Sequence, residues 1–384
     1  APLRVQDGRS GSDRYVMYTG GTTGMPKGVL WQQSDLIKGV LLAGGRHGPP
    51  RTVGEAVDRA RASGARVLAA APLMHGLGQW MALGSLLSGN TVVLDESRHF
   101  DPRRLWSLAA AAGAAVIGVA GDAMAGPLAD VLPDVAGSLD LSALKVLYSS
   151  AALLSPAVRG KLLSGLPHIR VVDAYGSSET GPHAQATAAT ATGPGEGGRF
   201  VVDHRTAVLD DALCPVEPGS GAVGWAARTG HIALGYHKDP ERTARTFPVI
   251  GGVRWSVSGD AATVEADGSI RLLGRGAACI NSGGEKIYPD EVEAALKAHP
   301  VIRDAVVVGV PDARFGERVV AVVSSRDGAI PEADLDRHVR RSLAGYKVPR
   351  AYFFVPDVRR SPAGKPDYRW AREEVLQRAG APAG

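Results

Sequence analysis

The stretch Tyr18-Thr-Gly-Gly-Thr-Thr-Gly-Met-Pro-Lys-Gly-Val29 stands near the start of this chain of 384 residues. It holds four glycines, three threonines and one lysine between apolar flanks. Glycine leaves no Cβ to obstruct a bound group, so successive backbone N–H groups can converge into a nest for an anion. Threonine hydroxyls add donors, and Lys27 adds a point charge that suits phosphate. The stretch therefore predicts a loop that binds polyphosphate.

The spacing of this loop differs from the Walker A pattern of P-loop NTPases, G-x-x-x-x-G-K-[ST]. Pro26 stands where the second glycine should be, and Gly28 follows Lys27 in place of serine or threonine. These two differences argue against a conventional P-loop NTPase. From the loop alone, a flexible surface turn remains the alternative, because glycine-rich stretches are common turn material.

The composition indicates a globular protein of two or three domains. Apolar residues make up 45% of the chain, and 43 basic against 39 acidic residues give a net charge of +4. We find no long basic run with interleaved aromatics, so nucleic-acid binding has little support. The two cysteines, Cys214 and Cys279, are far apart and fit a reducing compartment. Without a signal peptide or a long apolar run, we expect a cytoplasmic protein and no transmembrane helix.

Short apolar runs alternate with helical patterns, which predicts α/β architecture. We expect residues 1–192 to form an α/β core, 193–276 a β-rich subdomain and 277–384 a small α+β domain. The predicted strands are 14–19, 66–71, 91–94, 115–119, 145–148, 170–174, 207–209, 223–226, 269–273, 305–310 and 319–324. The predicted helices are 53–62, 103–112, 156–163, 289–298, 332–343 and 369–378.

Four further segments carry side chains suited to nucleotide chemistry. Tyr175-Gly-Ser-Ser-Glu-Thr-Gly181 follows a predicted strand and offers hydroxyls and a carboxylate, and Ser256-Val-Ser-Gly-Asp260 ends with a carboxylate. Gly274-Arg-Gly-Ala-Ala-Cys-Ile-Asn-Ser-Gly-Gly-Glu-Lys286 joins the large and small predicted domains. Ser361-Pro-Ala-Gly-Lys-Pro-Asp-Tyr368 places one lysine in a loop near the C-terminus.

In order and spacing, these five motifs resemble the adenylate-forming superfamily of acyl-CoA synthetases, firefly-luciferase-like enzymes and peptide-synthetase adenylation domains. The glycine loop, the junction motif and Gly364-Lys-Pro-Asp-Tyr368 are most similar to actinobacterial CoA ligases for fatty acids and steroid side-chain acids. The resemblance covers the chain from Tyr15 onward. It implies a large α/β domain with a β-rich subdomain, followed by a small mobile α+β domain. It also implies an N-terminal truncation, because relatives carry a long segment ahead of the loop.

The resemblance implies two half-reactions. A carboxylic acid and ATP, with Mg²⁺, form acyl-AMP and pyrophosphate, and coenzyme A then displaces AMP. Two anions meet in the first step, so fixed cations and hydrogen-bond donors matter most. A lipid substrate would allow contact with a membrane surface. The alternatives are an acyl-AMP ligase that feeds a carrier protein and a truncated nucleotide-binding remnant without turnover.

The resemblance also implies roles for the residues of the first two motifs. Tyr175 and Gly176 would lie along adenine, Ser178 would contact the α-phosphate and Glu179 would hold Mg²⁺. The family often has threonine at the position of Ser178, and serine keeps the hydroxyl. From the residues alone, Glu179 could instead cap a helix that begins near Ser177. The residues expected at the β- and γ-phosphates are Thr19, Gly20, Gly21, Thr22, Thr23, Gly24 and Lys27.

For the later motifs, Asp260 would accept from the ribose hydroxyls with the help of Arg275, and Lys365 would bridge the attacking carboxylate and the α-phosphate. Gly283 and Gly284, followed by Glu285, would admit the pantetheine thiol. The alternatives without a functional role are a turn residue for Asp260, a structural ion pair for Arg275 and a solvated side chain for Lys365.

The resemblance also implies that His75 lies beside the acyl pocket and acts in catalysis. From the residues alone, a core histidine is the alternative. Ala277 occupies the place where many relatives have a charged hinge residue. A small side chain can still absorb a backbone rotation. The alanine does, however, remove any charge interaction at the hinge itself.

Overall fold

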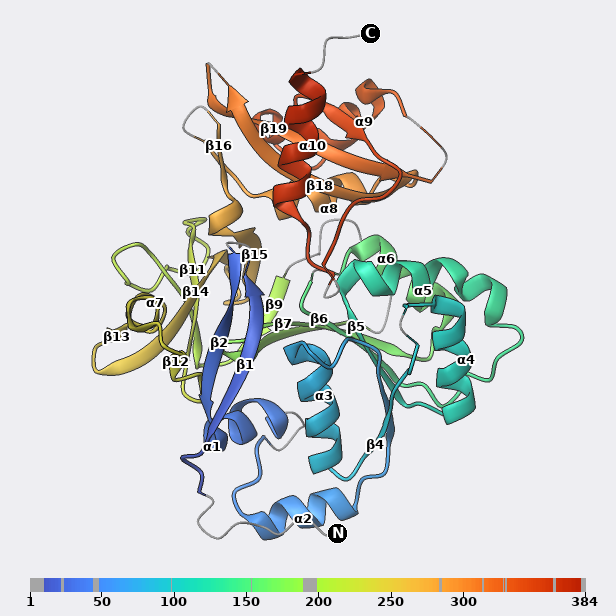
Figure 1. Cartoon of the computed structure of the whole chain (residues 1–384), viewed down its shortest axis with the longest axis vertical. Helices are drawn as coiled ribbons and strands as arrows, with labels where there is room; N and C mark the ends of the chain where they lie inside the picture. Colours follow the sequence, from blue (N-terminus) through green and yellow to red (C-terminus); the bar gives the residue numbers. More distant parts are fainter. Residues whose placement is uncertain are drawn as a thin grey trace.

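The computed structural model describes residues 10–21, 24–43, 48–97, 99–152, 154–188, 199–282, 285–312, 314–326, 328, 330–361 and 364–380. Within these residues the strands form one mixed sheet of twelve strands, one of three and one of five. The five-stranded sheet belongs to a C-terminal unit that sits above the larger body (Figure 1). The predicted α/β class is confirmed.

One half of the large sheet is parallel, in the order β4-β3-β5-β6-β7. Its short strands are rich in valine, leucine and isoleucine, as expected for strands that are covered on both faces. Ile117 and Leu147 are fully buried in the core that these strands share with α4, α5 and α6. The bounds are β3 Arg66–Ala69, β4 Thr91–Val93, β5 Val116–Ala120, β6 Val146–Ser150, β7 Arg170–Ser177, α4 Pro102–Ala112, α5 Gly121–Val135 and α6 Pro156–Gly165.

The other half of the large sheet is antiparallel and continues from β7 through β8-β9-β15-β14-β11-β10, with β13 paired to β14. The turn between β7 and β8 therefore lies where the sheet changes from parallel to antiparallel. It is placed at the carboxyl end of a parallel strand, where ligands of open α/β sheets bind. The bounds are β8 Gly181–Ala188, β9 Arg199–Val202, β10 Thr206–Leu209, β11 Gly224–Thr229, β13 Val249–Ile250, β14 Val253–Val264 and β15 Ile270–Arg275.

The glycine-rich stretch joins the two strands of a hairpin. Strand β1 (Arg14–Gly21) pairs antiparallel with β2 (Gly24–Gln32), and β12 (Gly235–Tyr236) pairs with the far edge of β2. Trp31 is fully buried in the small core beneath this sheet. The neighbouring helical elements are α1 Gln33–Leu36, the π-helical turn Ile37–Leu41, α2 Val53–Arg61, α3 Gly76–Leu87 and α7 Pro240–Thr246.

The C-terminal unit has its own apolar cores on the two faces of its sheet. Val307 and Ala321 point to one core with α8 and α9, while Val306 and Val322 point to the other with α10, as the alternation of strand side chains dictates. The bounds are β16 Ile280–Ser282, β17 Glu285–Ile287, β18 Ile302–Asp312, β19 Gly316–Ser325, β20 Tyr352–Phe354, α8 Pro289–Lys297, α9 Glu332–Val339 and α10 Tyr368–Gly380.

The sequence did not predict α3 or α5. Helix α5 carries Pro127 and Pro133 in its interior, and proline normally ends or kinks a helix. Burial of the α5 side chains Met124, Leu128 and Leu132 against the sheet offsets this cost. Among the described helices, we find none that is long and apolar enough to cross a membrane.

Candidate active site

One cavity of about 1590 Å³ brings together residues from four distant segments. Thr19 comes from β1, His75 from the start of α3, Gly176 and Ser178 from the end of β7 and its turn, and Lys365 from the loop ahead of α10. Figure 1 shows this last loop reaching from the C-terminal unit toward the strand ends of the large sheet. The structure thus gathers residues that the sequence predicted from separate motifs.

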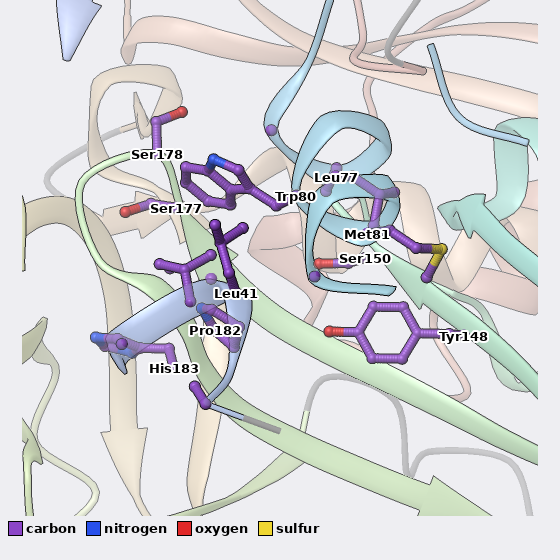
Figure 2. Close-up of a pocket in the computed structure, with 18 of the residues that line it drawn as sticks. Leu41, Leu77, Trp80, Met81, Tyr148, Ser150, Ser177, Ser178, Pro182 and His183 are labelled. Atoms are coloured by element: carbon purple, nitrogen blue, oxygen red, sulfur yellow. The ribbon is translucent and has the colours of Figure 1, made fainter. Parts of the chain in front are cut away.

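The two ends of the cavity differ in chemistry. Figure 2 shows the hydroxyls of Ser177 and Ser178 beside Trp80 at one end. Met81, Tyr148 and Ser150 lie at the other end, where the thioether of Met81 and the ring of Tyr148 add apolar surface. The arrangement suits a polar reacting group at the β7–β8 turn and an apolar tail that extends away from it.

Glu179 lies in the β7–β8 turn and is held by contacts from three directions. Its Oε1 accepts a 2.6 Å hydrogen bond from the Tyr236 hydroxyl, and its carbonyl accepts from the Ala233 N–H at 2.9 Å. Its own N–H donates to Oγ of Ser177 at 3.2 Å. No helix begins near Ser177 in the described chain, because β8 starts directly after the turn. The interpretation of Glu179 as a helix cap is therefore wrong.

Lys27 approaches the same tyrosine from the glycine-rich hairpin. Its Nζ lies 5.6 Å from the centroid of the Tyr236 ring, and β12 places this ring by pairing Tyr236 with Val29. Burial, followed by the charge of Glu179, raises the pKa of the Tyr236 phenol, so it stays a hydrogen-bond donor. One tyrosine thus connects the predicted phosphate-binding lysine with the predicted metal-binding carboxylate.

His75 and Lys365 meet in the cavity. The imidazole Nε2 of His75 is buried without a hydrogen-bond partner among the described residues. Burial lowers the pKa of His75, and the nearby charge of Lys365 lowers it further. At neutral pH the ring is uncharged, which leaves Lys365 as the cation at this position. His75 lines the cavity and is half-buried, which differs from a fully buried core histidine.

The Lys365 loop depends on Gly364. This glycine has φ of 74°, a left-handed conformation that favours glycine. A Cβ added here would lie 2.8 Å from Cβ of Ala123, near the start of α5. The backbone of the loop therefore passes close to α5 where it enters the cavity.

Asp260 lies within strand β14, so its interpretation as a turn residue is wrong. Its Oδ2 accepts from the Tyr175 hydroxyl at 2.8 Å and from Oγ of Ser258 at 3.3 Å. Arg275 pairs with Asp260 in the β14–β15 register. Tyr175 and Asp260 thus form a hydrogen-bonded pair next to the cavity, and so do Glu179 and Tyr236.

Several predicted positions lie outside what the structure describes. Thr22, Thr23, Gly283 and Gly284 fall outside the described residues, and the side chain of Arg275 is not described. Gly20 and Gly21 end β1, Gly24 begins β2 and Ala277 lies in the short 3₁₀ turn Gly276–Ala278. The proposed roles of these residues stay predictions.

The sequence missed most of the apolar wall of the cavity. Leu77, Trp80, Met81 and Gly84 follow the i, i+3, i+4, i+7 spacing of one helix face, and all four line the cavity from α3. That spacing was the available signal. Tyr148 and Ser150 come from β6, whose period of two places both on the cavity side.

Comparison with known proteins agrees with this geometry. The AMP-binding enzyme family matches residues 6–237, and its C-terminal domain family matches residues 291–365. A medium/long-chain-fatty-acid–CoA/3-oxocholest-4-en-26-oate–CoA ligase from Mycobacterium marinum is 47% identical over 97% of this chain and 68% of its own length. The 3-oxocholest-4-en-26-oate–CoA ligase from Rhodococcus rhodochrous is 46% identical over 98% of this chain and 69% of its own length.

Solved structures of other proteins share the fold of this chain. The amide bond synthetase McbA from Marinactinospora thermotolerans superposes with a TM-score of 0.74 at 29% identity, over 94% of this chain and 69% of McbA. ATP-bound MatB from Rhodopseudomonas palustris superposes with a TM-score of 0.76 at 25% identity, over 95% of this chain and 69% of MatB.

Proposed function

This chain belongs to the AMP-binding enzyme family, and we propose that it is an AMP-forming acyl-CoA synthetase for fatty or steroid side-chain acids. The acid would react with ATP to give acyl-AMP and pyrophosphate, and coenzyme A would then displace AMP to give the thioester. The names of the similar ligases from Mycobacterium marinum and Rhodococcus rhodochrous support this substrate class.

The observation that carries the proposal is the position of Lys365. Its loop enters the cavity near His75, and Ser178 lines the same cavity. In the first half-reaction a carboxylate must approach a negatively charged α-phosphate, so a fixed ammonium between them lowers the barrier. Lys365 supplies that charge, Ser178 supplies a hydroxyl for the phosphate and neutral His75 adds no positive charge of its own beside Lys365.

The residues near the glycine-rich hairpin fit a magnesium nucleotide. No cluster of three or more His, Cys, Asp or Glu side chains that could hold a metal occurs among the described residues. Mg²⁺ in nucleotide sites is commonly held by one or two carboxylates together with substrate phosphates, so Glu179 alone meets the requirement. Bound there, the ion would neutralise phosphate charge. Lys27 would bind the departing pyrophosphate, while Tyr236 orients the Glu179 carboxylate.

The far end of the cavity favours an apolar acid. Leu77, Met81 and Tyr148 present carbon surface there, and burial of an apolar chain gains about 25 cal/mol for each Å² removed from water. A long alkyl chain or a steroid skeleton supplies such surface, whereas a short polar acid does not. We therefore propose that affinity rises with the apolar surface of the acid.

Two assays on the purified chain test the proposal. ATP–pyrophosphate exchange measures the first half-reaction, and thioester formation with coenzyme A measures the second, over a panel of short, long and sterol-derived acids. We expect both activities, with the highest kcat/KM for the apolar acids. Acyl-AMP that accumulates without thioester would point to a carrier-protein ligase. ATP binding without exchange would point to a remnant without turnover.

A further inference from the structure

Two ion pairs connect the C-terminal unit to one side of helix α5. Oδ2 of Asp122 lies 3.1 Å from Nζ of Lys297, at the end of α8. Oδ2 of Asp130 lies 2.5 Å from Nη1 of Arg326, just after β19. The two aspartates are about two turns apart on α5, so both can face the same partner unit. Each pair exists only while the C-terminal unit rests on α5.

The pair between Asp122 and Lys297 is strongly shielded from water. The two side chains are 14% and 13% exposed, respectively. Burial acts most strongly against the charged form of Lys297, but the attractions of Asp122, Asp304 and Glu293 together outweigh it, so the pKa of Lys297 is raised. Glu293 and Asp304 belong to the same unit as Lys297, whereas Asp122 comes from the large body, so a turn of the C-terminal unit costs the buried Lys297 its partner Asp122.

Each aspartate also keeps a contact within its own unit. Asp130 accepts from Nζ of Lys161 on α6 at 2.8 Å, and Oδ1 of Asp122 accepts from the Ser155 N–H at 2.7 Å. These partners remain when the C-terminal unit turns away, so each carboxylate keeps one hydrogen-bond or ion-pair partner. The interface can therefore separate and form again.

The same contact region contains the loop that carries Lys365. Arg360 makes two 2.6 Å hydrogen bonds to the carboxylate of Asp304, and its Nη1 donates to the carbonyl of Gly364 at 2.9 Å. Gly364 in turn packs against Ala123, the residue after Asp122. The ion pairs on α5 thus lie beside the point where the Lys365 loop enters the cavity.

We propose that Asp122 and Asp130 are positioning residues that form a latch with Lys297 and Arg326, and that this latch selects the orientation in which Lys365 faces the cavity. The charge interaction that Ala277 cannot supply at the hinge is supplied on α5. The inference rests on the proposed function in one respect, because it assigns the latched orientation to the first half-reaction. The latch serves adenylation and is released for thioester formation.

Separate assays of the two half-reactions distinguish this positioning role from a general effect on folding. Arg326→Gln should reduce ATP–pyrophosphate exchange by about threefold, as for a partly exposed ion pair, and Arg326→Lys should restore it. Asp122→Asn, which removes the partner of the buried Lys297 on α5, should reduce exchange by about thirtyfold or more. The rate of thioester formation from synthetic acyl-AMP and coenzyme A should stay within about twofold of the unchanged chain, because that step does not use the latch.

Asp134→Asn is the matched control. Asp134 lies on α5 as well, but it pairs with Arg103 of the same unit. Its loss should leave both half-reactions and the melting temperature nearly unchanged. Equal losses in both half-reactions for Arg326→Gln and Asp122→Asn, or no loss in either, would overturn the latch.

A distance measurement tests the latch without reference to activity. Spin labels at Ser107→Cys on α4 and Ala333→Cys on α9, with both natural cysteines replaced by serine, report the separation of the two units. We expect one narrow distance distribution that becomes broad with Arg326→Gln and stays narrow with Asp134→Asn. A distribution that Arg326→Gln leaves unchanged would refute the latch, even if the chain proved inactive and the proposed function failed.

Discussion

The hydroxyl of Tyr236 donates a 2.6 Å hydrogen bond to Oε1 of Glu179, although the two residues are 57 positions apart in the sequence. The same ring lies 5.6 Å from Nζ of Lys27. A tyrosine from the short strand β12 therefore orients the carboxylate proposed to bind Mg²⁺ and contacts the lysine proposed to bind pyrophosphate. None of the five sequence motifs contains this residue.

Tyr236→Phe should weaken the first half-reaction. The change removes a hydrogen bond to a charged group, worth about 1.5–3 kcal/mol, and leaves the ring in place under Lys27. We expect kcat/KM for MgATP in the exchange assay to fall by about tenfold, with an increased Mg²⁺ requirement. Tyr346→Phe is the control, because Tyr346 is 42% exposed and outside the cavity. Unchanged MgATP kinetics in Tyr236→Phe would contradict the role.

The sequence predicted the regular elements better than the contacts between them. Apolar periodicity indicated the strands that became β3, β5, β6 and β7, because each is a short run of branched residues in the buried sheet. Helix α5 was missed because Pro127 and Pro133 are local signals against a helix, and only packing on the sheet overrides them.

In the candidate site, too, the sequence predicted local motifs but not the contacts between distant segments. Lys365 and Glu179 could be predicted because each stands in a motif of several residues. Tyr236 could not, because its partner in space comes from another segment and a lone tyrosine carries no local signal. The pairing of β12 with β2, which brings Tyr236 beside Val29, is a tertiary contact that composition and periodicity do not encode.

Gly364→Ala should reduce adenylation without unfolding the chain. A Cβ at this position would contact Ala123 at 2.8 Å and would impose strain at φ of 74°. We expect ATP–pyrophosphate exchange to fall by about tenfold or more, because an error of about 1 Å in the place of Lys365 is costly to catalysis. Exchange and the melting temperature are measured together.

Gly251→Ala is the control for backbone strain at the Gly364 position. Gly251 also has a left-handed conformation, with φ of 57°, but an added Cβ would meet no atom within 4 Å. It should lower the melting temperature slightly and leave exchange unchanged. If both variants lose exchange equally, the contact of Gly364 with Ala123 has no special role.

The pKa of His75 gives the exchange reaction a defined pH dependence. Burial, and then the charge of Lys365, holds this pKa below 6.5. The ring therefore stays neutral at pH 7, and we expect a loss of exchange only on the acid side, where protonation adds a second cation beside Lys365. His75→Asn, which has no charge at any of these pH values, should flatten this acid limb. An acid limb that is the same in both chains would contradict the assignment.

The free energy of unfolding should also decrease on the acid side, as the exchange activity does. In the unfolded chain His75 takes up a proton near pH 6.5, whereas in the folded chain it does so only at lower pH. The unfolded state thus binds more protons in this range, and the free energy of unfolding decreases as the pH is lowered through it. His75→Asn should reduce this decrease in denaturant titrations at a series of pH values.

Lys365→Ala is the most direct test of the proposed chemistry. The ammonium would act on charge that develops at the α-phosphate, and loss of one such group typically costs about a hundredfold to a thousandfold in rate. We expect ATP–pyrophosphate exchange to fall by this factor while the KM for MgATP changes little, because Lys27 and Glu179 still hold the nucleotide. Thioester formation from synthetic acyl-AMP should persist, since that step requires no attack on phosphate. Lys145→Ala is the control, because the Lys145 ammonium donates to the carbonyl of Ser142 at the surface. Equal loss of both half-reactions in Lys365→Ala would show that the lysine supports the fold and not the adenylation step.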